Sequence, residues 1–187
     1  EGDVASGEAQ AAVCAACHGQ DGNSMVPSFP KLAGLGERYL YEQMVAIRDG
    51  ERVVAQMAGQ VDNKSDQELA DLAAYFNSLE RSGGQADPKL VDLGEKVYRA
   101  GVAGRNVAAC TACHGPHGQG NGPAGFPGLA GQHAEYIEAQ LKAYQTGYEK
   151  PGEGRYTDGE AKVMRSNAFG LSDLEIKAVA SYIAGLQ

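Results

Sequence analysis

Cys-Ala-Ala-Cys-His at residues 14–18 decides the fold of this chain, and Cys-Thr-Ala-Cys-His at residues 110–114 repeats it. Cys-x-x-Cys-His is the attachment signal of a c-type haem. Side chains three and four positions apart share one face of a helix, so both cysteines can form thioether bonds to one porphyrin while the histidine turns towards its iron. Because the two motifs use all four cysteines, we expect two covalently bound haem c groups.

Two other uses of a Cys-x-x-Cys pair are known, and the sequence argues against both. A redox dithiol does not require the histidine. A four-ligand zinc site needs a second closely spaced pair in each half of the chain. We therefore interpret both motifs as haem sites. The residues expected to anchor the haems are Cys14, Cys17, Cys110 and Cys113, and the expected proximal iron ligands are His18 and His114.

The composition is that of a globular, soluble protein, with 43% hydrophobic and 21% charged residues among 187. No apolar run reaches the ~18 residues that a transmembrane helix needs. No signal-peptide pattern follows Glu1, so if the protein is exported we expect this to be its mature form. The net charge of −8 argues against nucleic acid as a partner. Residues 1–84 carry −7 of this charge, which either orients the molecule on a charged partner or only maintains solubility.

An internal repeat sets the domain organisation. Residues 29–34 match 126–131, and the stretch from Met57 to Leu79 matches the stretch from Met164 to Leu186 at a constant offset. The predicted domains are residues 1–80 and 89–187, with a turn-rich linker at 81–88. Residues 101–109 and 148–163 are insertions in the second half, and the sequence does not indicate their role.

Each repeat predicts the order helix, haem loop, helix, ligand loop, helix, and no alternating strand pattern occurs, so the expected fold is all-α. We expect the middle helix of the first half at residues 37–49. The remaining boundary signals are glycines that end the two middle helices (Gly50 and Gly147), capping boxes that begin the two last helices (Ser65 with Glu68, and Ser172 with Glu175), and Asp87-Pro88 at the start of the second half's first helix.

An electron-carrying c-type haem needs a second axial ligand, and methionine opposite histidine is the usual pair. Met57 and Met164 occupy equivalent places in the repeat, each eight residues before a capping-box serine. We expect these two to bind the irons. Met44 lies within the middle helix and is expected in the core, whereas Met25 lies in a Pro-rich loop and has no methionine counterpart.

Two further histidines, His117 and His133, have no histidine at the matching places of the first half. We expect them to be surface or capping residues. If either replaced Met164, the second haem would have two histidine ligands and a lower potential.

The turns after the motifs resemble those of the class I cytochromes c. In that family a Pro-x-Leu-x-Gly turn places the proline carbonyl against the free N–H of the ligand histidine, and residues 30–34 and 127–131 both fit. The resemblance implies that Pro30 and Pro127 orient the two histidines. Family first helices often carry Gly-x-x-x-aromatic. Gly94 and Tyr98 fit, but Gly7 is followed by Ala11, so smaller side chains are expected in the first domain.

Two such units in tandem, each with a Phe-Pro-x-Leu-Ala-Gly turn and a methionine ahead of a Ser-Asp-x-Glu helix, resemble the cytochromes c4. That family implies two domains related by a pseudo-two-fold axis and a place in the periplasm, free or loosely held at the membrane surface. It also implies a carrier without enzymatic activity. Its expected partners are a quinol-cytochrome c reductase or a periplasmic dehydrogenase as donor, and a terminal oxidase as acceptor.

Two other functions fit parts of the pattern. A cytochrome subunit of a larger redox enzyme, such as flavocytochrome sulfide dehydrogenase, resembles the same tandem fold. A dihaem peroxidase needs an iron with an open position, whereas both haems here have a methionine to fill it. Because small domains bury a modest share of their surface, we also expect the protein without haem to be poorly folded.

Overall fold

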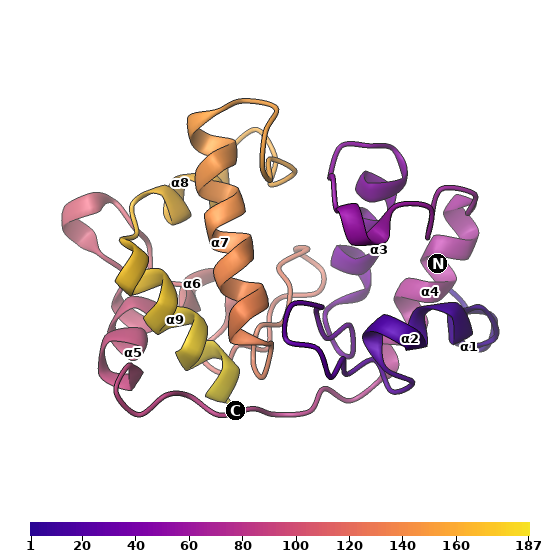
Figure 1. Ribbon diagram of the computed structural model, residues 1–187, viewed down its shortest axis with the longest axis horizontal. Helices are drawn as coiled ribbons and strands as arrows, with labels where there is room; N and C mark the ends of the chain where they lie inside the picture. Colours follow the sequence, from indigo (N-terminus) through magenta and orange to yellow (C-terminus); the bar gives the residue numbers. More distant parts are fainter. The chain divides into compact units, whose positions relative to one another are not determined.

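The computed structural model describes residues 1–187, and the chain divides into two compact units. The first unit contains Glu1–Ser82 and Gly120–Gly128, and the second contains Gly83–Gln119 and Leu129–Gln187. Both are built from helices (Figure 1), and the only β contacts are two isolated bridges, Val102 with Val107 and Asn121 with Phe126. The all-α prediction is therefore confirmed.

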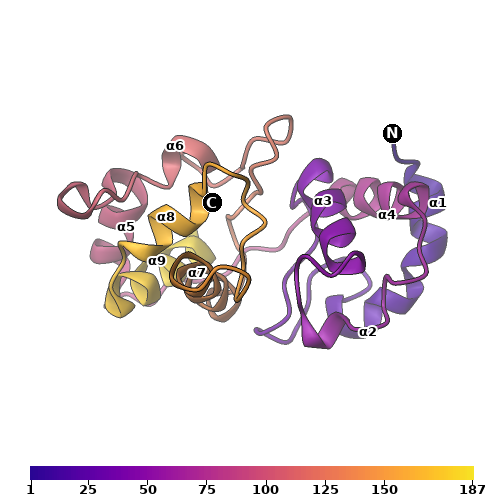
Figure 2. The ribbon, with the colours of Figure 1, turned by 90° about the horizontal axis from the view of Figure 1, so that it is seen from above.

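In the first unit the last helix is central. The elements are α1 (Val4–Gln10), the 3-10 turn η1 (Ala11–Cys14), α2 (Ala15–His18), α3 (Glu37–Arg48), the 3-10 turn η2 (Ala55–Met57) and α4 (Asp66–Ser78). Helix α4 packs against both α1 and α3 (Figure 2). Its apolar stripe, with Leu69, Leu72 and Phe76, is fully buried in the core.

The second unit repeats this plan with additions. Its elements are α5 (Val91–Ala100), the 3-10 turn η3 (Ala103–Arg105), α6 (Thr111–His114), α7 (Ala134–Glu149), α8 (Val163–Phe169) and α9 (Asp173–Gly185). Helix α9 packs against α5 and α7, as α4 does against α1 and α3, and the additional helix α8 packs against α7. The core contains Ile176 and Val179 from α9 and Tyr98 from α5.

Several predicted helix boundaries are confirmed. Helix α3 spans Glu37–Arg48 with Asp49 as its C-cap residue, and Gly50 follows with φ of +80°, a left-handed conformation that suits glycine. Both last helices begin with complete capping boxes. In the first, Ser65 N donates to Glu68 Oε2 at 2.8 Å and Glu68 N donates to Ser65 Oγ at 3.2 Å. The Ser172–Glu175 pair repeats this arrangement.

The prediction that Gly147 ends the second middle helix is wrong. Helix α7 continues through Gly147 to Glu149. A Cβ atom at this position would lie in contact with the backbone carbonyl of Arg155. The glycine is therefore required because a returning chain segment crosses the helix closely, and not because the helix stops there.

The predicted start of the second half's first helix at Asp87-Pro88 is also wrong. Helix α5 begins at Val91, after a turn in which Asp87 accepts hydrogen bonds from two backbone N–H groups. Its Oδ1 accepts from Lys89 N at 2.9 Å and its carbonyl accepts from Leu90 N at 2.9 Å. The Asp-Pro pair thus forms the turn ahead of the helix, as Asx residues commonly do.

A glycine lets the first and last helices of each unit cross closely. A Cβ atom on Gly7 would lie 2.7 Å from Tyr75 Cβ, and one on Gly94 would lie 2.6 Å from Tyr182 Cβ. One turn further along, Tyr98 is fully buried in the second unit, and the small Ala11 is buried in the first. The expected use of smaller side chains in the first unit agrees with this arrangement.

Substituting Gly94 with alanine is expected to destabilise the protein by about 2 kcal/mol, because the methyl group meets the Ala178 carbonyl and Tyr182 across a packed interface. Denaturant unfolding of the holoprotein measures the change. Gly104→Ala is a matched control, since a Cβ atom there meets nothing within 4 Å. Equal unfolding midpoints for the two variants would contradict the close crossing.

Segment 120–128 is the place where the compact units depart from the sequence repeat. Its contacts place it in the first unit. Gly128 N donates to Leu35 O at 3.0 Å, and Arg38 Nη1 donates to Pro123 O at 2.8 Å. The predicted domain limits of 1–80 and 89–187 assign this segment by sequence order alone, so they do not account for these contacts.

Candidate haem sites

The first Cys-x-x-Cys-His motif forms a short helical turn. Cys14 ends η1, and Cys17 and His18 lie in α2. Cys14 is half-buried against the first core, Cys17 is exposed, and His18 is only 7% exposed. The turn ends at Gly19, whose φ of +79° favours glycine. The motif therefore presents two thiols and a buried imidazole within one helical turn.

The ring of His18 is held in one orientation by a backbone carbonyl. Its Nδ1 lies 2.9 Å from Pro30 O and donates to it as N–H, which leaves Nε2 as the nitrogen with a free lone pair. Burial lowers the pKa of His18 below its ordinary value, and the hydrogen bond to Pro30 opposes that shift. Burial thus favours the neutral imidazole, which is the form that binds a metal. This donor fits an iron in a haem.

The proline turn is fixed in the same way in both units. In the first, Gly22 O accepts from Leu32 N at 2.8 Å and from Ala33 N at 3.1 Å. In the second, Gly118 O accepts from Leu129 N at 2.7 Å and from Ala130 N at 3.0 Å. Both glycines have positive φ. The repeated glycine four residues after each histidine was visible in the sequence and marks this anchor.

The second motif has the same local form. Cys110 precedes α6 as its N-cap residue, and Cys113 and His114 lie within that helix. His114 is 5% exposed and its Nε2 is buried. Burial raises the pKa of Cys110 to about 11, and burial also raises the pKa of Cys14. Catalytic dithiols need the opposite shift, so these cysteines suit thioether bonds and not redox exchange.

A zinc site also finds no support. The structure contains no cluster of three or more His, Cys, Asp or Glu side chains that could hold a metal ion. Each motif instead supplies one buried histidine beside its cysteines. This is the donor set of a haem, in which the porphyrin provides the four equatorial ligands and the protein only the axial ones.

Tyr98 supports the end of the second motif, a role that the sequence did not indicate. Its hydroxyl donates to Gly115 O at 2.6 Å, and its ring packs against Tyr182 of α9 with ring centroids 5.5 Å apart. Burial raises the pKa of this phenol, so it stays a neutral donor. The contact links the first helix, the last helix and the residue that follows His114.

The two predicted ligand methionines lie in different local structures. Met57 ends η2, whereas Met164 lies in the first turn of α8. Both are half-buried and pack against the core of their own unit. Met44 packs against the first core from α3, as expected, and Met25 is 93% exposed. The packing of Met57 and Met164 agrees with their prediction as iron ligands, which stays a proposal.

The remaining histidines have other surroundings. His117 is exposed, and its Nδ1 lies 3.3 Å from Gln187 O. His133 is the N-cap residue of α7, and its backbone N–H donates to Gln132 Oε1 at 3.0 Å. Their environments agree with the expected surface and capping roles.

The two insertions in the second half meet around α8. Ala108 N, from the first insertion, donates to Asn167 Oδ1 at 2.8 Å. Arg105 Nη2 lies 2.7 Å from Glu175 Oε2 in the capping box of α9. From the second insertion, Asp158 forms an ion pair with Arg165, the residue after Met164. Both insertions thus support the helix that carries Met164, which has no counterpart in the first unit.

Two cations near the first proline turn were not predicted from the sequence: Lys31, which is buried, and Arg81, which is half-buried and was assigned to the linker. Arg81 donates at 2.8 Å to three carbonyls, those of Ala33, Gly34 and Gly128. Burial lowers its pKa to about 10. Lys31 Nζ donates to Ser82 O at 2.9 Å, and burial, followed by the charge of Arg81, lowers its pKa. Together they hold the turn whose Pro30 orients His18.

These observations define the chain as a tandem c-type cytochrome. The Cytochrome c family model matches residues 4–80 and 91–187. Cytochrome c4 of Pseudomonas aeruginosa is 53% identical over 185 residues, which cover 99% of this chain and 89% of that protein. Reduced recombinant cytochrome c4 from Pseudomonas stutzeri, a crystal structure, matches with a TM-score of 0.95 and 47% identity over 100% of both chains. The chain belongs to the cytochrome c4 family.

Membership of this family has direct consequences. The protein carries two covalently bound haem c groups, transfers electrons and is not an enzyme. A more distant relative is the thiosulfate dehydrogenase electron acceptor of Thiomonas intermedia, 35% identical over 94% of this chain and 79% of that protein. None of the helices combines the length and the apolar character that crossing a membrane requires.

Proposed function

We propose that this protein carries electrons in the periplasm from a quinol-oxidising complex or a periplasmic dehydrogenase to a terminal oxidase. The observation that carries the proposal is the likeness to a cytochrome c4 structure along the whole length of both chains. Such a carrier binds its partners weakly and briefly through small interfaces. The acidic first half, with −7 of the net charge of −8, would orient it towards basic docking surfaces.

The iron ligands proposed for the first haem are His18 and Met57, and those for the second are His114 and Met164. A bound haem c supplies an iron centre that alternates between Fe(III) and Fe(II). His18 presents Nε2 because Pro30 O holds Nδ1, and we propose the same role for Pro127 towards His114. With Met57 and Met164 as second ligands, neither iron would have an open position for a substrate such as peroxide, which suits a carrier.

The cysteines of each motif are the proposed covalent anchors. The thioether bonds of Cys14 and Cys17, and of Cys110 and Cys113, would keep each haem in place in both redox states. Because the histidine and methionine can stay bound in both states, little reorganisation accompanies electron transfer. The chain's own contribution would therefore be to hold the two donors of each haem in place.

The relative from Thiomonas intermedia suggests one class of donor. That protein is a thiosulfate dehydrogenase electron acceptor, so we include a dehydrogenase of this class among the donors proposed for this chain. The alternative donor is a quinol-cytochrome c reductase. The two differ in their substrate, thiosulfate or quinol, and can be tested separately with the same oxidised protein.

Stopped-flow absorbance tests the proposal directly. The oxidised protein is mixed with thiosulfate and its dehydrogenase, or with quinol and a quinol-cytochrome c reductase, and the reduced protein is mixed with a terminal oxidase. We expect rapid reduction by at least one donor and rapid oxidation by the oxidase, both slower at high salt because the docking is electrostatic. Rates no faster than those without the donor and oxidase proteins would contradict the proposed role.

A further inference from the structure

Each proposed methionine ligand lies in a connection between the middle and the last helix of its unit. In the first unit this connection runs from Asp49 to Ser65 and contains Met57. In the second it runs from Lys150 to Ser172 and contains Met164 within α8. A methionine on such a connection would reach an iron only where the connection holds it in place.

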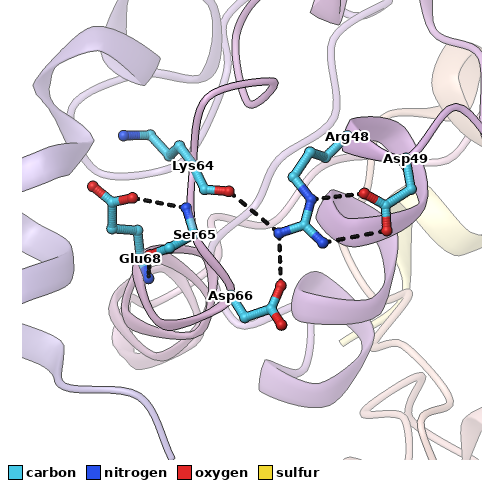
Figure 3. A network of polar contacts seen from close by, with 6 residues as sticks. All are labelled: Arg48, Asp49, Lys64, Ser65, Asp66 and Glu68. Carbon is cyan, nitrogen blue, oxygen red and sulfur yellow. Dashed lines mark hydrogen bonds and ion pairs between the residues drawn. The ribbon is translucent and has the colours of Figure 1, made fainter.

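In the first unit Arg48 joins the two ends of this connection (Figure 3). Arg48 is the last residue of α3. Its Nη1 donates to Lys64 O at 3.2 Å and to Asp66 Oδ1 at 2.6 Å, at the start of α4. Its Nε and Nη2 bind Asp49 at 2.8 and 3.2 Å. These hydrogen bonds raise the pKa of Arg48 and lower that of Asp49, so both groups stay charged.

In the second unit Gln145 occupies the place that corresponds to Arg48. Its Nε2 donates to Leu171 O at 3.0 Å and to Ala168 O at 2.9 Å. Leu171 corresponds to Lys64, since each directly precedes the capping-box serine of its unit. Ala168 belongs to α8, the helix that carries Met164. In each unit, therefore, a side chain near the end of the middle helix donates to the carbonyl that directly precedes the capping-box serine, although the side chains differ.

The last helices have other interactions that hold them in place. Both last helices have complete capping boxes of their own, and they pack against the middle helices through apolar cores. What the link holds is the end of the intervening connection, and this connection contains the methionine. The link recurs in both units, made by a charged guanidinium in one and by a neutral amide in the other. This recurrence indicates that Arg48 and Gln145 have the same role in their units.

We propose that Arg48 and Gln145 are positioning residues that hold Met57 and Met164 on the two irons by closing their connections. The proposal rests on the assignment of these methionines as iron ligands. An external ligand can bind iron only in the fraction of molecules whose connection is open, so its apparent affinity reports that fraction. Loosening the link increases the open fraction without altering the histidine side of the haem.

Imidazole binding to the ferric holoprotein tests the proposal. Proton NMR follows each haem separately, because each ferric haem has its own set of strongly shifted resonances. The spectra of Met57→Ala and Met164→Ala show which set belongs to which haem. Gln145→Glu keeps the side-chain shape but replaces both N–H donors with a carboxylate facing two carbonyls. We expect it to bind imidazole about tenfold more tightly at the second haem, with the first haem unchanged.

The corresponding change in the first unit is Arg48→Leu, which removes all its donors. Imidazole affinity should rise at the first haem only, by a smaller factor, because Asp66 is exposed and its pairing with Arg48 is screened by water. Arg48→Gln introduces the residue that the second unit uses and should restore much of the parental affinity. Each haem serves as the control for the variant in the other unit.

The outcomes separate the two proposals. If Met57→Ala and Met164→Ala leave the ferric haem spectra unchanged, the ligand assignment is wrong. If those variants change the spectra while Arg48→Leu and Gln145→Glu keep the parental imidazole affinities at both haems, the positioning role is overturned. A lower unfolding midpoint without a change in imidazole affinity would likewise overturn it, since the residues would then be merely structural.

Discussion

A variant with Cys14 and Cys17 both replaced by serine is expected to lose one haem and to fail to fold its first unit. His18 and the half-buried Cys14 face inwards, so without the porphyrin a polar imidazole would border an unfilled core. A unit of this size buries a modest share of its surface, and the haem would supply much of its apolar contact. Mass spectrometry measures the lost haem, and circular dichroism measures the lost helix.

In the matched variant Cys110 and Cys113 are both replaced by serine. This variant should lose the second haem and fail to fold the second unit, while the first unit stays intact. The absorbance of the remaining haem reports whether the untouched unit stays folded. A variant that loses a haem but keeps full helicity and a cooperative thermal transition would show that the haem is not part of the folding core. Such a result would also contradict the expectation that the protein without haem is poorly folded.

Replacing Met57 with histidine is expected to lower the reduction potential of the first haem by on the order of 0.2 V, because axial ligands set haem potentials over a range of about 0.8 V. The methionine sulfur is soft and uncharged and favours Fe(II), whereas a second imidazole favours Fe(III). A spectroelectrochemical titration measures both midpoints. The same replacement at Met164 should shift the other midpoint.

Two further measurements test whether a shift in potential arises from the loss of a methionine ligand. Met44→Leu is the control, since Met44 packs in the first core from α3 and should not alter either potential. The near-infrared band of Met–Fe(III) ligation should also fall by about half in each single variant. If the midpoints of the Met57→His and Met164→His variants match those of the parent protein, neither sulfur binds iron.

Local signals predicted the fold well. The capping boxes at Ser65 and Ser172 and the end of α3 before Gly50 depend on residues within a few positions of each other, and the structure confirms them. Gly147 was misread because the same residue type serves two purposes. It occupies the place of Gly50 in the repeat, but an insertion brings the Arg155 backbone against it, and no short-range pattern records that contact.

The candidate sites were predictable where the repeat preserved the residue type. The two motifs, the prolines and the methionines recur at matching places. Arg48 and Gln145 recur in position but not in chemistry, so comparing the halves by residue type hides their shared hydrogen bond. Arg81 was hidden for another reason. Glycines around it suggested a linker, whereas its three carbonyl partners lie more than 40 residues away.

Because segment 120–128 belongs to the first compact unit, that unit cannot be obtained by cutting the chain at a single position. A fragment that stops at Ser82 would lack Gly128, whose carbonyl accepts from Arg81 and whose N–H donates to Leu35. The fragment would keep the guanidinium but lose one of its acceptors. A minimal single-haem protein derived from the first unit would thus require a graft of the missing loop, or a smaller uncharged side chain at position 81.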